Sequence, residues 1–180
     1  MHRFRRLATP LACCLASFGV LVTSGGPAQA ADPLAIVCTT SATQHYDPGL
    51  TLVSKPTRIT ANATYTCTGG GSVDTAQLGF EYTVDAGCLP TSSPVTTGVS
   101  ILDWNEGPDS EITSTFVVTR PVGQTVGTSV GTVTAGQFDG YIFNLVGTYP
   151  APDLLACATP EGVTSSQGLL VLTLTQPFRG

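Results

Sequence analysis

Basic side chains are scarce in this sequence, and their scarcity excludes two classes of partner. Only seven of the 180 residues are Lys or Arg, against twelve Asp or Glu, and Arg3, Arg5 and Arg6 account for three of the seven. The rest of the chain has four basic and twelve acidic side chains, a net formal charge of −8. Nucleic acids and anionic membranes are bound by clustered Lys and Arg. The composition therefore predicts neither as a partner.

Side chains suited to catalysis are also few. Beyond residue 30 there is one histidine, His45, and no second imidazole to complete a metal site. No serine lies in the strand-to-helix context of a nucleophile elbow, and the cysteines lack the CxxC spacing that would indicate zinc. We therefore expect a protein that is not an enzyme and has no cofactor. A small secreted hydrolase is the alternative, because glycoside hydrolysis needs only two carboxylates. The candidates for such a pair are Asp103, Glu106, Asp109 and Glu111.

The first thirty residues have the layout of a secretory signal peptide. A basic start is followed by the apolar stretch Leu7–Val22 and by Ala28-Gln29-Ala30, a small-x-small cleavage site. Pro10 interrupts the apolar stretch, which argues against a permanent membrane span. We expect cleavage after residues 1–30, so that residues 31–180 form a single all-β domain of an exported protein with no membrane span.

Four cysteines remain after such cleavage, and they predict two disulfides. An even number of cysteines in an exported domain is typical of a disulfide framework. Cys38, Cys67, Cys88 and Cys157 allow three pairings. We favour Cys67–Cys88, which would join the ends of two adjacent strands, and Cys38–Cys157, which would tie the first strand to the late part of the chain.

Hydrophobic alternation and abundant threonine predict strands throughout this domain. Residues 31–180 contain 26 threonines, and β-branched side chains suit a half-buried pleated surface better than a helix. Period-two alternation is clearest in Arg58–Cys67 and Thr75–Asp85, with a glycine-rich turn between them. The other expected strands are Ile36–His45 (ended by Asp47-Pro48-Gly49), Val99–Trp104, Ile112–Arg120, Thr125–Thr134, Tyr141–Thr148 and Gly168–Gln176.

The number and length of these strands favour one architecture over another. Eight short antiparallel strands without an amphipathic helix are typical of an immunoglobulin-like β-sandwich. A closed β-barrel is the alternative, because the alternation has the same period in both. Gly123–Val133 has a glycine at every fourth position, and we interpret it as an edge strand or a bulged strand.

The densest group of polar side chains lies in Asp103–Glu111. Asn105, Gly107 and Pro108 are typical turn residues, and they predict a hairpin turn here. The alternative is a calcium site, because oxygen-bearing side chains alternate along the segment, although the glycine and the closing glutamate of an EF-hand are misplaced. The calcium candidates are Asp103, Asn105, Asp109 and Glu111.

The single tryptophan, Trp104, lies beside this turn. A buried Trp104 would be an ordinary core aromatic, which is the interpretation that we favour. An exposed ring with Tyr46, Tyr141 or Tyr149 nearby would instead form a stacking platform for a sugar. The candidate ligand-binding residues are therefore Trp104, Asn105 and Glu106.

Several motifs occur in an order that resembles a group of known proteins. They are Asp47-Pro48-Gly49-Leu50-Thr51, Trp104-Asn105-Glu106-Gly107, GTVTAGQFDG at residues 131–140 and LLACATPEGVTSS at residues 154–166. These motifs look like those of a group of small secreted β-sandwich proteins from actinobacteria, and the resemblance covers nearly all of residues 31–180. The resemblance implies export, a β fold and the four-cysteine framework, and it brings no activity or catalytic residues.

Two other classes share general properties with the chain. Its composition is similar to that of the neocarzinostatin-type apoproteins, acidic immunoglobulin-like carriers whose disulfides close shorter loops, and its size and cysteine number fit a secreted protease inhibitor. We expect a secreted, non-enzymatic protein with an extracellular or cell-wall binding role. The expected partner is a polysaccharide, the cell wall or another extracellular protein. The alternative functions are a carbohydrate-binding module and a small-molecule carrier.

Overall fold

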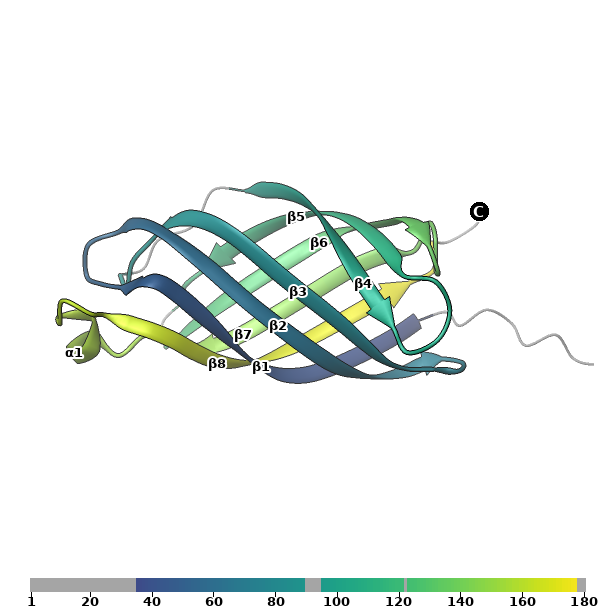
Figure 1. The fold of residues 1–180 in the computed structure, drawn as a ribbon, viewed down its shortest axis with the longest axis horizontal. Coiled ribbons are helices and arrows are strands. Elements are labelled where there is room, and N and C mark those ends of the chain that lie inside the picture. The colour runs from purple at the N-terminus through teal and green to yellow at the C-terminus, as the bar shows by residue number, and fades with distance from the viewer. Residues whose placement is uncertain (1–34, 90–94, 122, 178–180) are drawn as a thin grey trace, which may run out of the picture. The chain divides into compact units, whose positions relative to one another are not determined.

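A computed structural model describes residues 35–89, 95–121 and 123–177, which all belong to one compact unit, Asp32–Gly180. The predicted signal peptide, residues 1–30, lies outside the described residues. Eight antiparallel strands and one short helix follow one another along the chain (Figure 1). They are β1 (Ala35–Leu50), β2 (Lys55–Gly70), β3 (Val73–Ala86), β4 (Thr96–Trp104), β5 (Ser110–Thr119), β6 (Gln124–Gly136), β7 (Ile142–Pro150), α1 (Leu154–Cys157) and β8 (Val163–Thr175).

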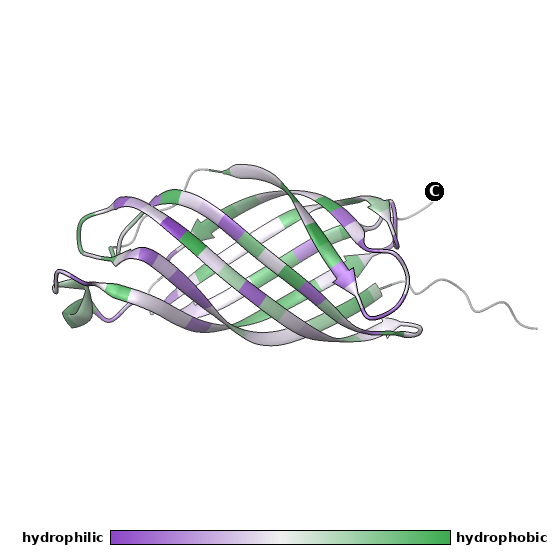
Figure 2. Cartoon of the chain, in the orientation of Figure 1, coloured by the Kyte–Doolittle hydropathy of each residue, from purple (hydrophilic) through white to green (hydrophobic). Residues whose placement is uncertain are grey.

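Alternating side chains along each strand separate an apolar interior from a polar exterior. In β2, Ile59, Ala61 and Tyr65 are buried. Asn62 and Thr64, which lie between them in the sequence, are exposed. The same alternation appears as bands of differing hydropathy along the ribbons (Figure 2). The prediction of an all-β fold with eight strands is therefore confirmed.

The strands close into a barrel rather than a sandwich. Each strand pairs with its neighbours in chain order, and β1 also pairs with β8, from Ala35 opposite Thr175 to His45 opposite Ser165. The immunoglobulin-like arrangement that we favoured is therefore wrong, and the closed barrel given as the alternative is the architecture that forms. Alternation shows which side of a strand is buried, but the pattern is the same whether or not the first and last strands pair with each other.

Two local interpretations also change because of this closure. Asp47-Pro48-Gly49 does not end the first strand, because β1 continues through these residues, across a cis peptide before Pro48, to Leu50. Gly123–Val133 is no edge strand, because β6 pairs with both β5 and β7. The register between β5 and β6 does shift after Glu111, next to Val133, as a bulge would require.

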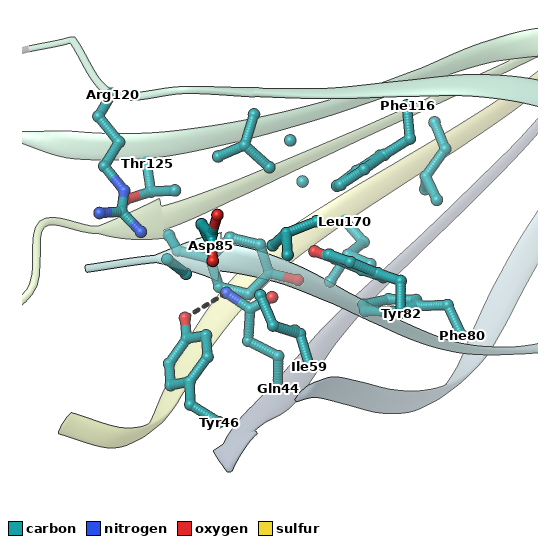
Figure 3. Close-up of a pocket in the computed structure, with 17 residues that line it drawn as sticks. Gln44, Tyr46, Ile59, Phe80, Tyr82, Asp85, Phe116, Arg120, Thr125 and Leu170 are labelled. Carbon is teal, nitrogen blue, oxygen red and sulfur yellow. Dashed lines mark hydrogen bonds between the residues drawn. The ribbon is translucent and has the colours of Figure 1, made fainter. Parts of the chain in front are cut away.

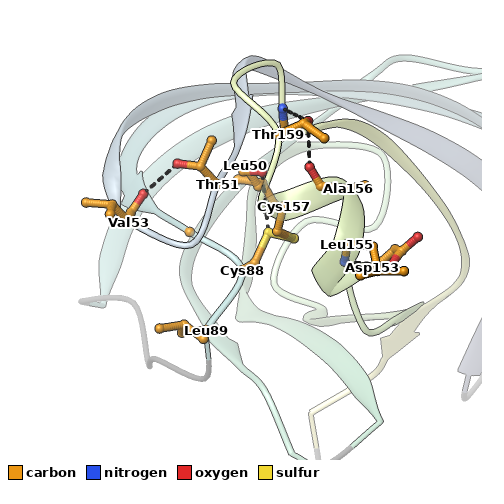
Figure 4. The surroundings of a disulfide bond; sticks show 12 residues. Leu50, Thr51, Val53, Cys88, Leu89, Asp153, Leu155, Ala156, Cys157 and Thr159 are labelled. Carbon is orange, nitrogen blue, oxygen red and sulfur yellow. Dashed lines mark hydrogen bonds between the residues drawn. A yellow bond between two sulfur atoms is a disulfide. The ribbon is translucent and has the colours of Figure 1, made fainter.

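The four cysteines beyond residue 30 form two disulfides, but not with the pairing that we favoured. Cys38 and Cys67 lie directly opposite each other on β1 and β2, and they are bonded. Cys88, just after β3, is bonded to Cys157 at the end of α1 (Figure 4). The predicted pairs Cys67–Cys88 and Cys38–Cys157 are wrong, because the register of β1 against β2 brings Cys38 to Cys67 and sequence spacing does not reveal that register.

The second disulfide organises one end of the barrel. The chain that follows β1 is held between the two cysteines, because Cys88 N donates to Thr51 O at 2.8 Å and Leu52 N donates to Cys157 O at 3.2 Å. Helix α1 begins at an N-cap, where Asp153 Oδ1 accepts a hydrogen bond from Leu155 N at 2.9 Å. Among the described residues, no helix is long and apolar enough to cross a membrane.

The wall of the barrel is incompletely paired between β3 and β4. Leu78 pairs with Leu102 and Ala76 with Trp104, but no pairs continue beyond Leu78 toward the end of β3. The segments 79–86 of β3 and 96–101 of β4 therefore have no hydrogen-bonded ladder between them, although β4 is paired with β5 from Thr96 to Leu102. The hydrogen-bonded wall of the barrel is thus interrupted between these two segments.

Candidate ligand-binding site

The barrel interior contains two groups of packed side chains with space between them. One group includes Trp104 and Leu170, and the other includes Tyr46 and Ile59. Leu170, Tyr46 and Ile59 also line a cavity of about 60 Å³, so that the cavity lies where the two groups meet. A single water molecule needs only about 10–15 Å³ by this kind of measure. The cavity therefore has room for more than one buried water.

Two glycines leave this space empty. Gly127 of β6 and Gly147 of β7 lie opposite each other in the sheet, and both line the cavity. A Cβ atom at Gly127 would lie 3.2 Å from the ring of Phe116, and one at Gly147 would lie 3.0 Å from the ring of Tyr149. Side chains at these two positions would occupy the space that the rings enclose.

Aromatic side chains form one wall of the cavity. Phe80 and Tyr82 of β3 have ring centroids 5.7 Å apart, and Tyr82 and Phe116 of β5 have centroids 5.1 Å apart. The three rings lie together on one side of the cavity (Figure 3), which Leu170 also lines. Such a wall provides apolar area and ring faces for a small organic molecule.

The cavity continues toward the gap between β3 and β4. A second cavity, of about 210 Å³, shares Phe80, Tyr82, Phe116 and Leu145 with the first. Its other lining residues include Thr96, Gly98, Val99 and Ser100, all from the part of β4 that has no partner on β3. The shared side chains show that the two spaces adjoin, and the second one reaches the incompletely paired wall.

Polar side chains gather at the other side of the first cavity. Gln44 Nε2 donates a hydrogen bond to Tyr46 Oη at 2.5 Å. Arg120, which directly follows β5, reaches toward the same region (Figure 3). Its Nη1 donates to the carbonyl oxygens of Gly87 and, at 3.3 Å, of Leu89. Its buried Nε has no hydrogen-bond partner among the described residues.

Burial changes the acid–base properties of these groups. Desolvation lowers the pKa of Arg120, because removal from water disfavours its charged form. Desolvation raises the pKa of Tyr46 and of Tyr82, and in both cases the nearby Arg120 charge opposes the increase. Burial, with a smaller effect of Tyr46, raises the pKa of Tyr149 to about 12. At neutral pH the cavity therefore presents neutral phenols beside one guanidinium.

Trp104 does not form a sugar-stacking platform. Its side chain is 5% exposed, its Nε1 donates to Ser110 Oγ at 2.8 Å, and its ring lies edge-on to Phe138. The interpretation of Trp104 as a core aromatic agrees with this burial, and the exposed alternative is wrong. Tyr46 and Tyr149, which were candidates for the same platform, line the cavity instead.

The side chains of the turn after Trp104 form hydrogen bonds that hold neighbouring segments together, and they do not form a cluster of carboxylates. Asn105 Oδ1 accepts hydrogen bonds from the backbone of Asp74 and Thr75 at 3.0 and 2.9 Å. Glu111 Oε1 accepts from Thr134 at 3.2 Å. In the part of the chain that the structure describes, no three His, Cys, Asp or Glu side chains form a group that could hold a metal ion. The calcium candidates, Asp103, Asn105, Asp109 and Glu111, are therefore not brought together as a site, and Glu106 is exposed in the turn.

Two further residues, His45 and Ser129, are of types that take part in catalysis, and both lie in strands. His45 is an exposed residue of β1. Ser129 lies within Gly-Thr-Ser-Val-Gly, a spacing shared with nucleophile elbows, but this segment is part of the regular strand β6. Its Oγ donates to Ser114 Oγ at 2.9 Å inside the barrel.

Sequence reasoning missed Arg120 as a site residue, although one signal was present. Arg120 ends a run in which every second residue of β5, from Ile112 through Phe116, points to the interior. A charged side chain in the buried phase of a strand is unusual, because burying a charge is costly. Gln44 gives the same signal in β1, where it is a buried polar residue between apolar neighbours in the inward phase.

No protein-family model matches the chain, and neither a curated protein nor a solved structure matches it significantly.

Proposed function

We propose that this protein binds and carries a small, largely apolar molecule inside its barrel. The observation that supports this most is the cavity, lined by aromatic and aliphatic side chains, in which facing glycines at 127 and 147 preserve the space. Small-molecule sites are typically concave, apolar and provided with a few polar groups. An eight-stranded barrel has an interior wide enough for one small ligand. Carrier function, one of the alternatives from the sequence, is thus the function that we favour.

We place the entrance between β3 and β4. The second cavity extends from the aromatic wall to the residues of β4 that have no partner on β3. The other end of the interior is filled by Trp104, Phe138 and Tyr141, whose rings are in contact. A ligand that enters through the gap would meet Phe80 and Tyr82 first.

Binding accounts for the lining better than hydrolysis does. A glycoside hydrolase needs two carboxylates on either side of the bond that it cleaves. Asp85 is the one acidic residue among those that line the first cavity, and Glu81 lines only the second. We therefore keep the proposal of a non-enzymatic protein.

We also propose that the protein acts outside the cell. Two disulfides are typical of an oxidising compartment, and the N-terminal segment has the layout of a signal peptide. N-terminal sequencing of the secreted product should give Ala31 as its first residue. A product that retains Met1 would contradict the proposal.

Ligand binding can be tested with a neutral fluorescent probe. N-phenyl-1-naphthylamine becomes fluorescent in apolar surroundings, and it should bind the wild-type barrel saturably. Gly127→Leu should abolish binding because the new side chain occupies the cavity beside Phe116. Thr132→Leu is the matched control, because it adds the same side chain on the exposed face of the same strand.

The outcome depends on variants that remain folded, so a second one is needed. Leu145→Trp fills the space shared by the two cavities and tests the same idea without a change at a glycine. Circular dichroism and thermal melting should show that the variants keep the barrel. The proposal is overturned if the wild type binds no probe, or if both folded variants bind it as the wild type does.

A further inference from the structure

We propose that the ligand is an organic anion whose acidic head is bound by Arg120 beside Tyr46, with its apolar body against the aromatic wall. This inference rests on the proposed carrier function and specifies the class of ligand. It depends on how the guanidinium is placed and on what surrounds it.

Among the residues that the structure describes, no carboxylate forms an ion pair with the guanidinium of Arg120. The ion pair found among the described residues joins Arg58 to Glu81 at 2.8 Å, on the outside of the barrel. Asp85 is the other charged residue that lines the first cavity, but it is exposed and forms no ion pair with Arg120 in the described part of the chain. Arg120 is partly buried, and removing a cation from water without a counter-charge is unfavourable. An anion in the cavity would remove this cost.

The backbone holds Arg120 in position but leaves it incompletely bonded. Nη1 is directed to the carbonyl oxygens of Gly87 and Leu89, next to the disulfide at Cys88. The buried Nε has no partner among the described residues. A guanidinium offers five N–H donors in a planar fork, which suits the oxygens of a carboxylate, sulfonate or phosphate. Arg120 is therefore oriented in advance, with a donor still to be satisfied.

The neighbouring polar groups complete a site for oxygen atoms. Tyr46 Oη accepts a hydrogen bond from Gln44 and lies in the field of the Arg120 charge. Figure 3 shows Arg120, Tyr46 and Gln44 on one side of the cavity and Phe80, Tyr82 and Phe116 on the other. Asp85 lies at the same end as Arg120 (Figure 3), so the cavity has a charged, hydrogen-bonding end and an apolar, aromatic end. A molecule that complements both has an acidic head on an apolar body.

A pair of probes that differ in one acidic group tests this assignment. 1-Anilinonaphthalene-8-sulfonate is N-phenyl-1-naphthylamine with a sulfonate added, so that the pair isolates the contribution of the anion. The wild type should bind the sulfonate about tenfold or more tightly than the neutral probe, the scale of one hydrogen bond to a charged group. Arg120→Gln should remove this preference and change the affinity for the neutral probe by less than about twofold.

Matched variants separate recognition from a structural role. Arg58→Gln removes an arginine from the exterior of the barrel, and it should leave the preference unchanged. Arg120→Lys keeps the charge but loses the planar fork, so it should retain part of the preference. If Arg120 only braces the carbonyl oxygens of Gly87 and Leu89, Arg120→Gln will lower the melting temperature and leave the preference intact, which would overturn the inference.

The wild type alone also decides the question if the variants unfold. Equal affinity for the two probes would refute the anion site while leaving the carrier function in place. Binding of neither probe would instead refute the carrier function. The inference is supported if the wild type and Arg58→Gln both bind the sulfonate more tightly than the neutral probe. The inference is overturned if Gly127→Leu is folded and no longer binds the neutral probe but binds the sulfonate as tightly as the wild type does.

Discussion

Replacing Trp104 by alanine should destabilise the barrel strongly. The indole is 5% exposed, it packs edge-on against Phe138 with centroids 5.3 Å apart, and Nε1 donates to Ser110 Oγ. Ser110 in turn donates to Gln137 O at 2.5 Å. The substitution would therefore remove a large buried side chain and a link that joins β4, β5 and the turn after β6.

The expected cost follows from the loss of a buried aromatic side chain. Substitution of a buried Trp by Ala costs about 3–5 kcal/mol. In a domain of this size each kcal/mol lowers the melting temperature by about 2–4 °C, so Trp104→Ala should lower it by about 6–20 °C. Trp104→Phe keeps most of the apolar contact, and it loses a neutral hydrogen bond worth about 1 kcal/mol together with some volume. The free energy of unfolding of Trp104→Phe should therefore lie between that of the wild type and that of Trp104→Ala.

Urea unfolding followed by circular dichroism measures these differences without relying on tryptophan fluorescence. Asp103→Ala is the control, because Asp103 is the exposed neighbour on the same strand and such surface changes stay within about 0.5 kcal/mol. In the wild type, acrylamide should quench the emission of the single tryptophan weakly. A loss below about 1 kcal/mol for Trp104→Ala, together with strong quenching, would refute the packing described for this end of the barrel.

Two further predictions concern the disulfides and the buried phenols. Replacing both cysteines of Cys88–Cys157 by serine should lower the free energy of unfolding by about 4.4 kcal/mol, and the same change at Cys38–Cys67 should lower it by about 3.6 kcal/mol. The first disulfide has the larger effect because it closes a loop of 69 residues and the second closes one of 29. Urea unfolding of the two variants would contradict this account if it gave the reverse order. Burial raises the pKa of Tyr149 to about 12 in the folded protein. The folded state therefore favours the neutral phenol, and this stabilises the protein fully below the ordinary tyrosine pKa of about 10. The stabilisation is lost as the pH rises from about 10 through about 12. Tyrosinate absorbance should therefore rise together with the loss of the circular dichroism signal, and the idea fails if all the tyrosines ionise near pH 10 with the fold intact.

The strands were predictable because their signal is local. Each expected strand overlaps an observed one, since alternation between apolar and threonine-rich positions is set by the side-chain period of a strand. Helix α1 was missed because its four residues are too few to show a helical period. The continuation of β1 through Pro48 was missed because the pairing of Leu50 with Val163 outweighs the local preference of Asp-Pro-Gly for a turn.

Long-range pairings needed the tertiary structure. The register between β1 and β2 places Cys38 opposite Cys67, and a shift by about two residues would separate them while keeping the apolar side chains of both strands on the same face. Gln44 and Tyr46 lie on β1, whereas Arg120 follows β5, and the sequence contains no motif that links Arg120 to the other two. They face one cavity because β1 closes the barrel and because β5 turns the side chain of Arg120 inward.

The sequence by itself determined that the chain forms strands, which face of most strands is apolar, and that the four cysteines beyond residue 30 are an even set suited to disulfides. These properties depend on a side chain and its near neighbours. Only the tertiary structure decided that the sheet closes, that β3 and β4 part beyond Leu78, and that glycines at 127 and 147 meet to leave a cavity beside Arg120. These features depend on register between strands, and many registers are compatible with one alternating pattern until the whole interior is packed.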